Sequence, residues 1–106
     1  MSASRIEVFE QMLAADPANS AVLFGLAKEY EKAGEDAKTI AMLERYLAAA
    51  DDEGNAYGML ARAYERARDT AKARAAYERG AEVASSHGHP GMAAEYREIL
   101  ESLSTP

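Results

Sequence analysis

Apolar side chains recur along this chain at the three- and four-residue spacing of amphipathic helices. Near the N-terminus Ile6, Phe9 and Leu13 form such a stripe. A second stripe near the C-terminus consists of Met92, Tyr96, Ile99, Leu100 and Leu103. No stretch reads as a strand. The pattern therefore predicts an all-α fold of about six helices, over residues 4–15, 20–33, 36–49, 57–67, 69–84 and 90–103.

Turn-forming residues separate these helices. Pro17 disfavours helical backbone in the residue before it, so the segment Asp-Pro-Ala-Asn predicts a turn, with Asn19 or Ser20 capping the next helix. Gly34 suits the left-handed conformation that ends many helices. The remaining predicted boundaries are a break at Asp51, Asp52, Gly54 and Asn55, a helix start at Asp69, and Pro90 as the first residue of the last helix.

The same pattern occurs twice at a fixed interval, the interval from Tyr30 to Tyr64. Placing residues 23–47 over residues 57–81 gives ten identities in 25 positions, among them Tyr30 with Tyr64 and Arg45 with Arg79. A single repeat of this kind cannot bury its own apolar face. It must therefore stack on a neighbour, and stacked repeats leave a continuous surface for binding.

The repeat resembles the tetratricopeptide repeat, a helix–turn–helix unit with the same period, about 34 residues, and a Trp, Leu-Gly, Tyr pattern in its first helix. The first full repeat supplies Leu23, Leu26, Ala27, Tyr30, Thr39 and Leu43. The second supplies Tyr57, Leu60, Ala61, Tyr64, Ala73 and Tyr77. Leucine and tyrosine replace the tryptophan, and alanines replace the glycine. The N-terminal helix fits an isolated second helix, because Phe9 precedes Pro17 by the spacing that the family keeps.

The resemblance implies a single domain over residues 1–106, a tetratricopeptide solenoid with a right-handed superhelical twist. Its parts are an N-terminal half repeat at 4–17, full repeats at 20–50 and 54–84, and a capping helix at 90–103. The small size, high alanine content and acidic character are similar to bacterial members of the family. The residues that stacking buries are expected to include Phe9, Leu26, Tyr30, Leu43, Leu60, Tyr64, Tyr77 and the C-terminal stripe.

Composition narrows the range of partners. Twelve basic and 18 acidic residues leave a net charge of −6, which argues against nucleic acid or an anionic membrane as the main partner. The chain has no cysteine, hence no disulfide and no thiolate chemistry. It has no apolar run of the roughly 18 residues that a membrane span needs, and its first residues do not form a secretory signal, so a cytoplasmic location is the expectation.

Family resemblance places the binding residues on the concave face, which the first helix of each repeat lines. The candidate residues for binding a peptide are Phe24, Lys28, Lys32, Asn55, Arg62 and Arg66. Lys28 with Arg62, and Lys32 with Arg66, are one repeat period apart and are expected to stack as basic rungs beside an exposed Phe24. Such a groove suits a peptide or protein with acidic side chains or a free carboxylate. The competing interpretation is a solvated face, in which Glu31 and Glu65 neutralise these cations.

Catalytic chemistry finds little support in the sequence. His87 and His89 are the only histidines, and no acidic or sulfur ligand lies close to them in sequence. His89 is more simply a helix cap, and His87 an exposed turn residue. No phosphate-binding glycine loop or nucleophile motif occurs. We expect no enzymatic activity, no catalytic residues, no metal and no cofactor.

Two functional classes remain open. One is a monomeric adaptor that binds a peptide or protein through the concave face. The other is a self-assembling scaffold, at most a homodimer, that uses its terminal helices. The second has a sequence basis in Val8 and Met12, which the predicted stacking of the first helix leaves less well covered.

Overall fold

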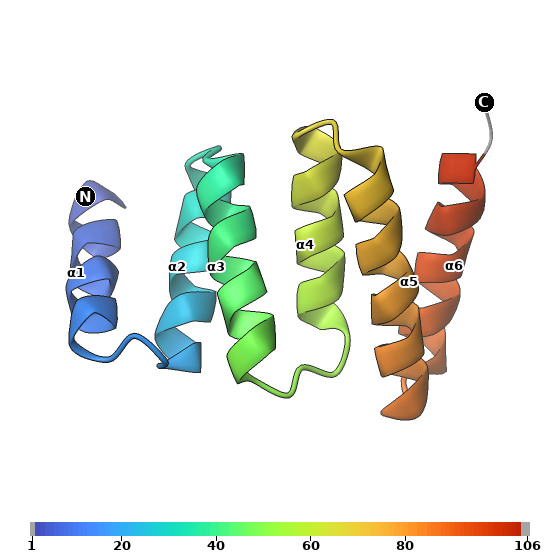
Figure 1. Ribbon diagram of the computed structural model, residues 1–106, viewed down its shortest axis with the longest axis horizontal. Helices are drawn as coiled ribbons and strands as arrows, with labels where there is room; N and C mark the ends of the chain where they lie inside the picture. The colour runs from blue at the N-terminus through green and yellow to red at the C-terminus, as the bar shows by residue number, and fades with distance from the viewer. Residues whose placement is uncertain (1, 105–106) are drawn as a thin grey trace. The chain divides into compact units, whose positions relative to one another are not determined.

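The computed structural model describes residues 2–104, and their side chains from residue 5 to residue 103. Six helices account for most of this range (Figure 1): α1 Ser2–Ala15, α2 Ser20–Lys32, α3 Asp36–Ala49, α4 Asn55–Arg66, α5 Thr70–Ser86 and α6 Pro90–Ser104. No residue from 2 to 104 is in a strand. The all-α prediction of six helices is confirmed. The chain forms two compact units, unit 1 (Met1–Ala50) and unit 2 (Asp51–Pro106), and each is described by itself.

Several predicted helix ends are confirmed in detail. Asn19 is the N-cap of α2, and its side-chain oxygen accepts a hydrogen bond from the Val22 N–H at 3.2 Å. Gly34 follows α2 with φ of +73°. The Glu35 N–H then donates to the Tyr30 carbonyl at 2.9 Å, which closes the helix in the manner of a Schellman motif. Asp69 caps α5 through the Lys72 N–H, and α6 begins at Pro90.

The start of α4 differs from the prediction, because Asn55 is helical and does not belong to the preceding break. The Asp52 carboxylate accepts hydrogen bonds from the N–H groups of Gly54 (2.8 Å) and Ala56 (3.0 Å). Gly54 has φ of +128°, a conformation that few other residues adopt. The aspartate and the glycine together turn the chain, so the helix can begin immediately after them.

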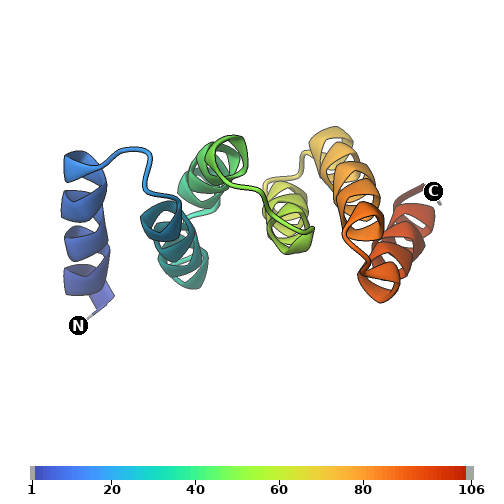
Figure 2. The same cartoon turned by 90° about the horizontal axis from the view of Figure 1, so that it is seen from below.

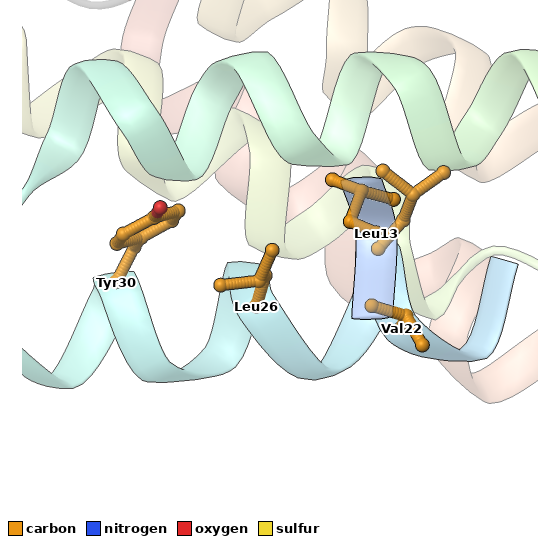
Figure 3. Close-up of a cluster of buried hydrophobic side chains, with 5 residues drawn as sticks. Leu13, Val22, Leu26 and Tyr30 are labelled. Carbon is orange, nitrogen blue, oxygen red and sulfur yellow. The ribbon is translucent and has the colours of Figure 1, made fainter. Parts of the chain in front are cut away.

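The core of unit 1 lies where α1 and α3 pack on α2. One buried cluster there consists of Leu13, Val22, Leu23, Leu26 and Tyr30 (Figure 3), and Ala27 and Leu43 are also fully buried. Phe9, predicted as core, is only half-buried and packs at the margin of this cluster. Its ring lies over Gly25, where an added Cβ would stand 3.2 Å from Phe9 Cζ. Because Gly25 has no side chain, the Phe9 ring can pack directly against α2 at this position.

In unit 2, α4, α5 and α6 pack side by side (Figure 2). Tyr96 of α6 packs against the other two helices. The Tyr96 hydroxyl donates to the Gly54 carbonyl at 2.8 Å, and its ring lies 5.7 Å from that of Tyr77. Two glycines leave the space for this ring. A Cβ on Gly58 would stand 2.9 Å from Tyr96 Cζ, and one on Gly80 would stand 2.9 Å from Tyr96 Cε2. The rest of the predicted C-terminal stripe, Met92, Ile99, Leu100 and Leu103, is half-buried and not fully buried.

The two repeats fill equivalent positions in different ways. Gly58 and Gly80 of the second repeat correspond, one repeat period earlier, to Phe24 and Tyr46 of the first. In unit 1 the rings of Phe24 and Tyr46 pack on each other, with centroids 5.0 Å apart. Unit 1 thus fills this space with its own aromatic pair, whereas unit 2 leaves it for Tyr96.

We expect Gly80→Ala to lower the free energy of unfolding by about 1–3 kcal/mol, because the new methyl would overlap both Tyr96 and the Tyr57 Cβ, 2.8 Å away. Gly91→Ala is the matched control, since a Cβ there meets no atom within 4 Å. Urea denaturation of both variants measures the difference. Both substitutions could instead stabilise the protein to the same extent, through helix propensity alone. That result would contradict the close packing of Tyr96 against Gly80.

Candidate functional site

The six residues predicted to bind a peptide come from one helix of each unit. Phe24, Lys28 and Lys32 are on α2 in unit 1. Asn55, Arg62 and Arg66 are on α4 in unit 2, and all three are exposed. The members of each expected basic rung therefore belong to different units, and the rungs stay a prediction.

Phe24 is not the exposed aromatic that the sequence suggested. Its side chain is half-buried, because one face of the ring packs against Tyr46 of α3. The Lys28 ammonium lies 5.4 Å from the centroid of the Phe24 ring, within the range of a cation–π interaction. Phe24, Tyr46 and Lys28 therefore form one cluster, in which a fixed aromatic pair supports an exposed cation.

Lys32 pairs with a different acid from the one expected. Its ammonium lies 3.7 Å from the carboxylate of Glu29, three residues earlier on α2. The Glu29 side chain is only 10% exposed and also pairs with Arg5 of α1 at 3.5 Å. The pattern of charges in the sequence directed attention to Glu31. The three-residue spacing of Glu29 and Lys32 is visible in the sequence, whereas the contact of Glu29 with Arg5 depends on tertiary packing.

On α4, the charge of Arg62 acts on a polar pair formed by Glu65 and Tyr77. The Tyr77 hydroxyl donates to the Glu65 carboxylate at 2.6 Å. Burial and then this hydrogen bond raise the pKa of Tyr77, and the Arg62 guanidinium partly offsets the rise. Glu65, which was expected to neutralise the basic residues, is thus engaged with Tyr77.

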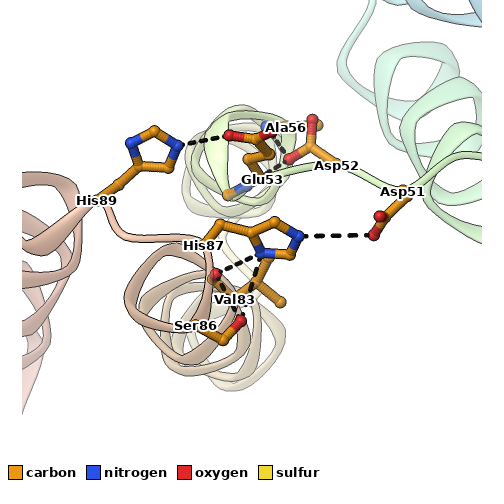
Figure 4. A network of polar contacts seen from close by, with 9 residues as sticks. Asp51, Asp52, Glu53, Ala56, Val83, Ser86, His87 and His89 are labelled. Carbon is orange, nitrogen blue, oxygen red and sulfur yellow. Dashed lines mark hydrogen bonds and ion pairs between the residues drawn. The ribbon is translucent and has the colours of Figure 1, made fainter.

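The structure also assembles acidic and histidine side chains that sequence reasoning did not connect (Figure 4). His89 Nε2 lies 2.5 Å from Glu53 Oε1, and His87 Nε2 lies 3.9 Å from Asp51 Oδ1. The hydrogen bond to His89 and then its charge lower the pKa of Glu53. The two members of each pair are separated in sequence by slightly more than one repeat period. Turns one period apart meet at the same end of a repeat unit, and this signal was available in the sequence.

These two His–acid pairs connect the turn before α4 with the turn before α6. The Nδ1 atom of His87 is 2.9 Å from the Val83 carbonyl, so the ring also covers the C-terminal end of α5. Within residues 2–104, no three His, Asp or Glu side chains are grouped to hold a metal ion. The two pairs point to separate partners, and their evident role is to join the turns.

Tyr30 provides a measurable readout of the packing of α1 on α2. Its hydroxyl donates to the Glu10 carboxylate at 2.5 Å. Burial first, and then the hydrogen bond and charge of Glu10, raise the pKa of Tyr30 to about 12. This group therefore contributes stability that is fully present below about pH 10 and is lost as the pH rises through about 12.

We predict that Glu10→Gln lowers the pKa of Tyr30 toward 10, because the variant loses the negative charge beside the hydroxyl. Titration of the tyrosine ring carbons by NMR measures this value residue by residue. The matched control, Glu65→Gln, should lower the pKa of Tyr77 and leave that of Tyr30 unchanged. An unchanged Tyr30 titration in Glu10→Gln would contradict the contact.

Comparisons with known proteins bear on the family. The family model described as Tetratricopeptide repeat matches residues 6–56, which include most of α1, all of α2 and α3, and the start of α4. Among solved structures, one titled "Crystal structure of MamA" superposes with a TM-score of 0.68 at 24% sequence identity. That match covers 93% of this chain and 66% of the MamA chain, so this chain spans just under two thirds of that protein. At this identity the likeness shows the fold alone. No curated protein gave a significant match.

No helix within residues 2–104 is both long enough and apolar enough to cross a membrane.

Proposed function

Because the chain belongs to the tetratricopeptide repeat family, whose fold generally mediates protein–protein interaction or assembly, we propose that it is an adaptor that binds an acidic peptide or protein segment. The proposed binding residues lie on the exposed side of the first helix in each repeat, α2 in unit 1 and α4 in unit 2, the helices to which the family resemblance assigns binding. The family consists typically of non-catalytic interaction modules, and we extend this to the present chain.

The observation that carries the proposal is the cluster of Phe24, Tyr46 and Lys28. Within the described part of the chain, the one interaction found for the Lys28 ammonium is with the Phe24 ring. A cation that rests on a ring keeps its charge available to a carboxylate. The two rings are half-buried and pack on each other, so they offer apolar contact at a low entropic cost.

The cations on α2 and α4 contribute unequally in this proposal. Lys32 pairs with Glu29, which it shares with Arg5, so its charge is partly compensated before any partner binds. Arg62 and Arg66 are exposed on α4, and a guanidinium can bind a carboxylate through two parallel hydrogen bonds. Lys28 and Arg62 are therefore the residues whose charge should matter most.

Charge reversal at Lys28 and Arg62 together tests the proposal. We expect Lys28→Glu with Arg62→Glu to weaken partner binding at least about tenfold, since two favourable ion pairs become repulsive. Binding is measured by affinity capture from a lysate of the source organism, followed by titration of the captured partner.

The matched control is Arg79→Glu with Arg97→Glu, which makes the same change in net charge at exposed positions of α5 and α6. Circular dichroism establishes that both variants are folded. Equal binding of the partner by both double variants would reject this face as the binding surface.

A second candidate function, self-association through α1, has one observation in its favour. Val8 and Met12, four residues apart on the outer side of α1, are 53% and 46% exposed, and they are the large apolar side chains found exposed among residues 5–103. A helix that leaves such a pair uncovered can pair with a second copy. We expect Val8→Lys with Met12→Lys to abolish any rise of mass with concentration in light scattering. A wild-type protein that stays monomeric at high concentration would exclude this function.

A further inference from the structure

The helix α2 presents a second face that the proposed function does not use. Leu26 follows Phe24 by two residues, about 200° around the helix, so the two side chains point to nearly opposite sides. On the side of Leu26, the three helices of unit 1 border a hollow of about 440 Å³. This volume is within the range of ordinary ligand pockets.

The floor of the hollow is apolar and is fixed by the core of unit 1. Leu13 of α1 and Leu26 and Tyr30 of α2 line it, and all three are buried members of the core cluster (Figure 3). The half-buried Met42 of α3 also lines the hollow. Side chains already packed in a core need no rearrangement to receive a guest, which favours binding.

The rim carries one charge of each sign, and hydrogen bonds hold both in place. On the α3 side, Arg45 Nη2 donates to the Pro17 carbonyl at 3.0 Å. A guanidinium has five N–H donors, so this bond leaves others for a ligand. On the α1 side, Glu10 accepts the Tyr30 hydroxyl at 2.5 Å through one oxygen, and a carboxylate can accept further bonds.

We propose that this hollow is a second docking site, which takes a segment of a partner protein with one aliphatic side chain between a basic and an acidic residue. The aliphatic side chain fills the apolar floor. The acidic residue pairs with Arg45, and the basic residue pairs with Glu10. The occupant is assigned by charge complementarity across the rim. The site lies wholly within unit 1 and does not depend on the face that carries Phe24 and Lys28.

The probes are capped pentapeptides with the central sequences Lys-Leu-Asp and Asp-Leu-Lys, which allow for either chain direction. They are titrated to millimolar concentration while backbone NMR shifts of the ¹⁵N-labelled protein are recorded. We expect one of them to shift the amides around Leu13, Leu26 and Met42. Replacing its leucine by alanine should weaken binding about tenfold, the effect of losing one buried leucine side chain.

The variants Arg45→Gln and Arg79→Gln form a matched pair, since these arginines are one repeat period apart at equivalent positions of the two repeats. Arg45→Gln should weaken binding of the acid-bearing peptide about two- to fivefold, and Arg79→Gln should leave it unchanged.

Filling the hollow with Ala14→Phe should abolish binding. Ala14 lies exposed at the edge of the hollow, so the larger side chain displaces no core residue.

Three results would overturn the proposal. One is the absence of shifts at the hollow with both peptides at millimolar concentration. Another is equal binding of the leucine and alanine peptides. The third is a shift pattern centred on Phe24 and Lys28, which would assign the peptides to the opposite face of α2 and leave the adaptor function intact.

Discussion

Each helix of this chain must bury an apolar stripe against its neighbours, and the places where two helices approach closely decide how it does so. Gly25 admits the ring of Phe9, and Gly58 with Gly80 admits the ring of Tyr96. Those gaps let the rings of Phe9 and Tyr96 pack closely against the repeats beside α1 and α6. The surfaces available for binding are the helix faces that this packing leaves exposed.

The periodic part of this arrangement could be predicted from the sequence. The spacing of apolar residues predicted the six helices, and Asn19, Gly34, Asp69 and Pro90 marked their ends because each acts through local backbone chemistry. Asn55 was wrongly placed, since the turn before α4 depends on how Asp52 folds back on the chain. Phe24 was wrongly expected to be exposed, because its burial depends on an aromatic ring contributed by the next helix, α3.

The candidate site was less predictable than the fold, because the partners of charged residues are set in three dimensions. Glu29 pairs with Lys32 on its own helix, at a spacing that the sequence shows, and it also pairs with Arg5 of α1, a contact that tertiary packing sets. The two histidines lie beside acids from the turn one repeat earlier, and nearest-neighbour reasoning along the chain could not supply that pairing. The repeat period itself could have indicated it.

We propose that this protein binds a partner through residues of α2 in unit 1 and of α4 in unit 2. The most direct test is hydrogen exchange, measured by mass spectrometry, on the complex with a purified partner. The account predicts that binding slows exchange in α2 around Phe24 and Lys28 and in α4 around Arg62. Slowed exchange confined to the turns that carry the two histidines, with α2 and α4 unchanged, would contradict it.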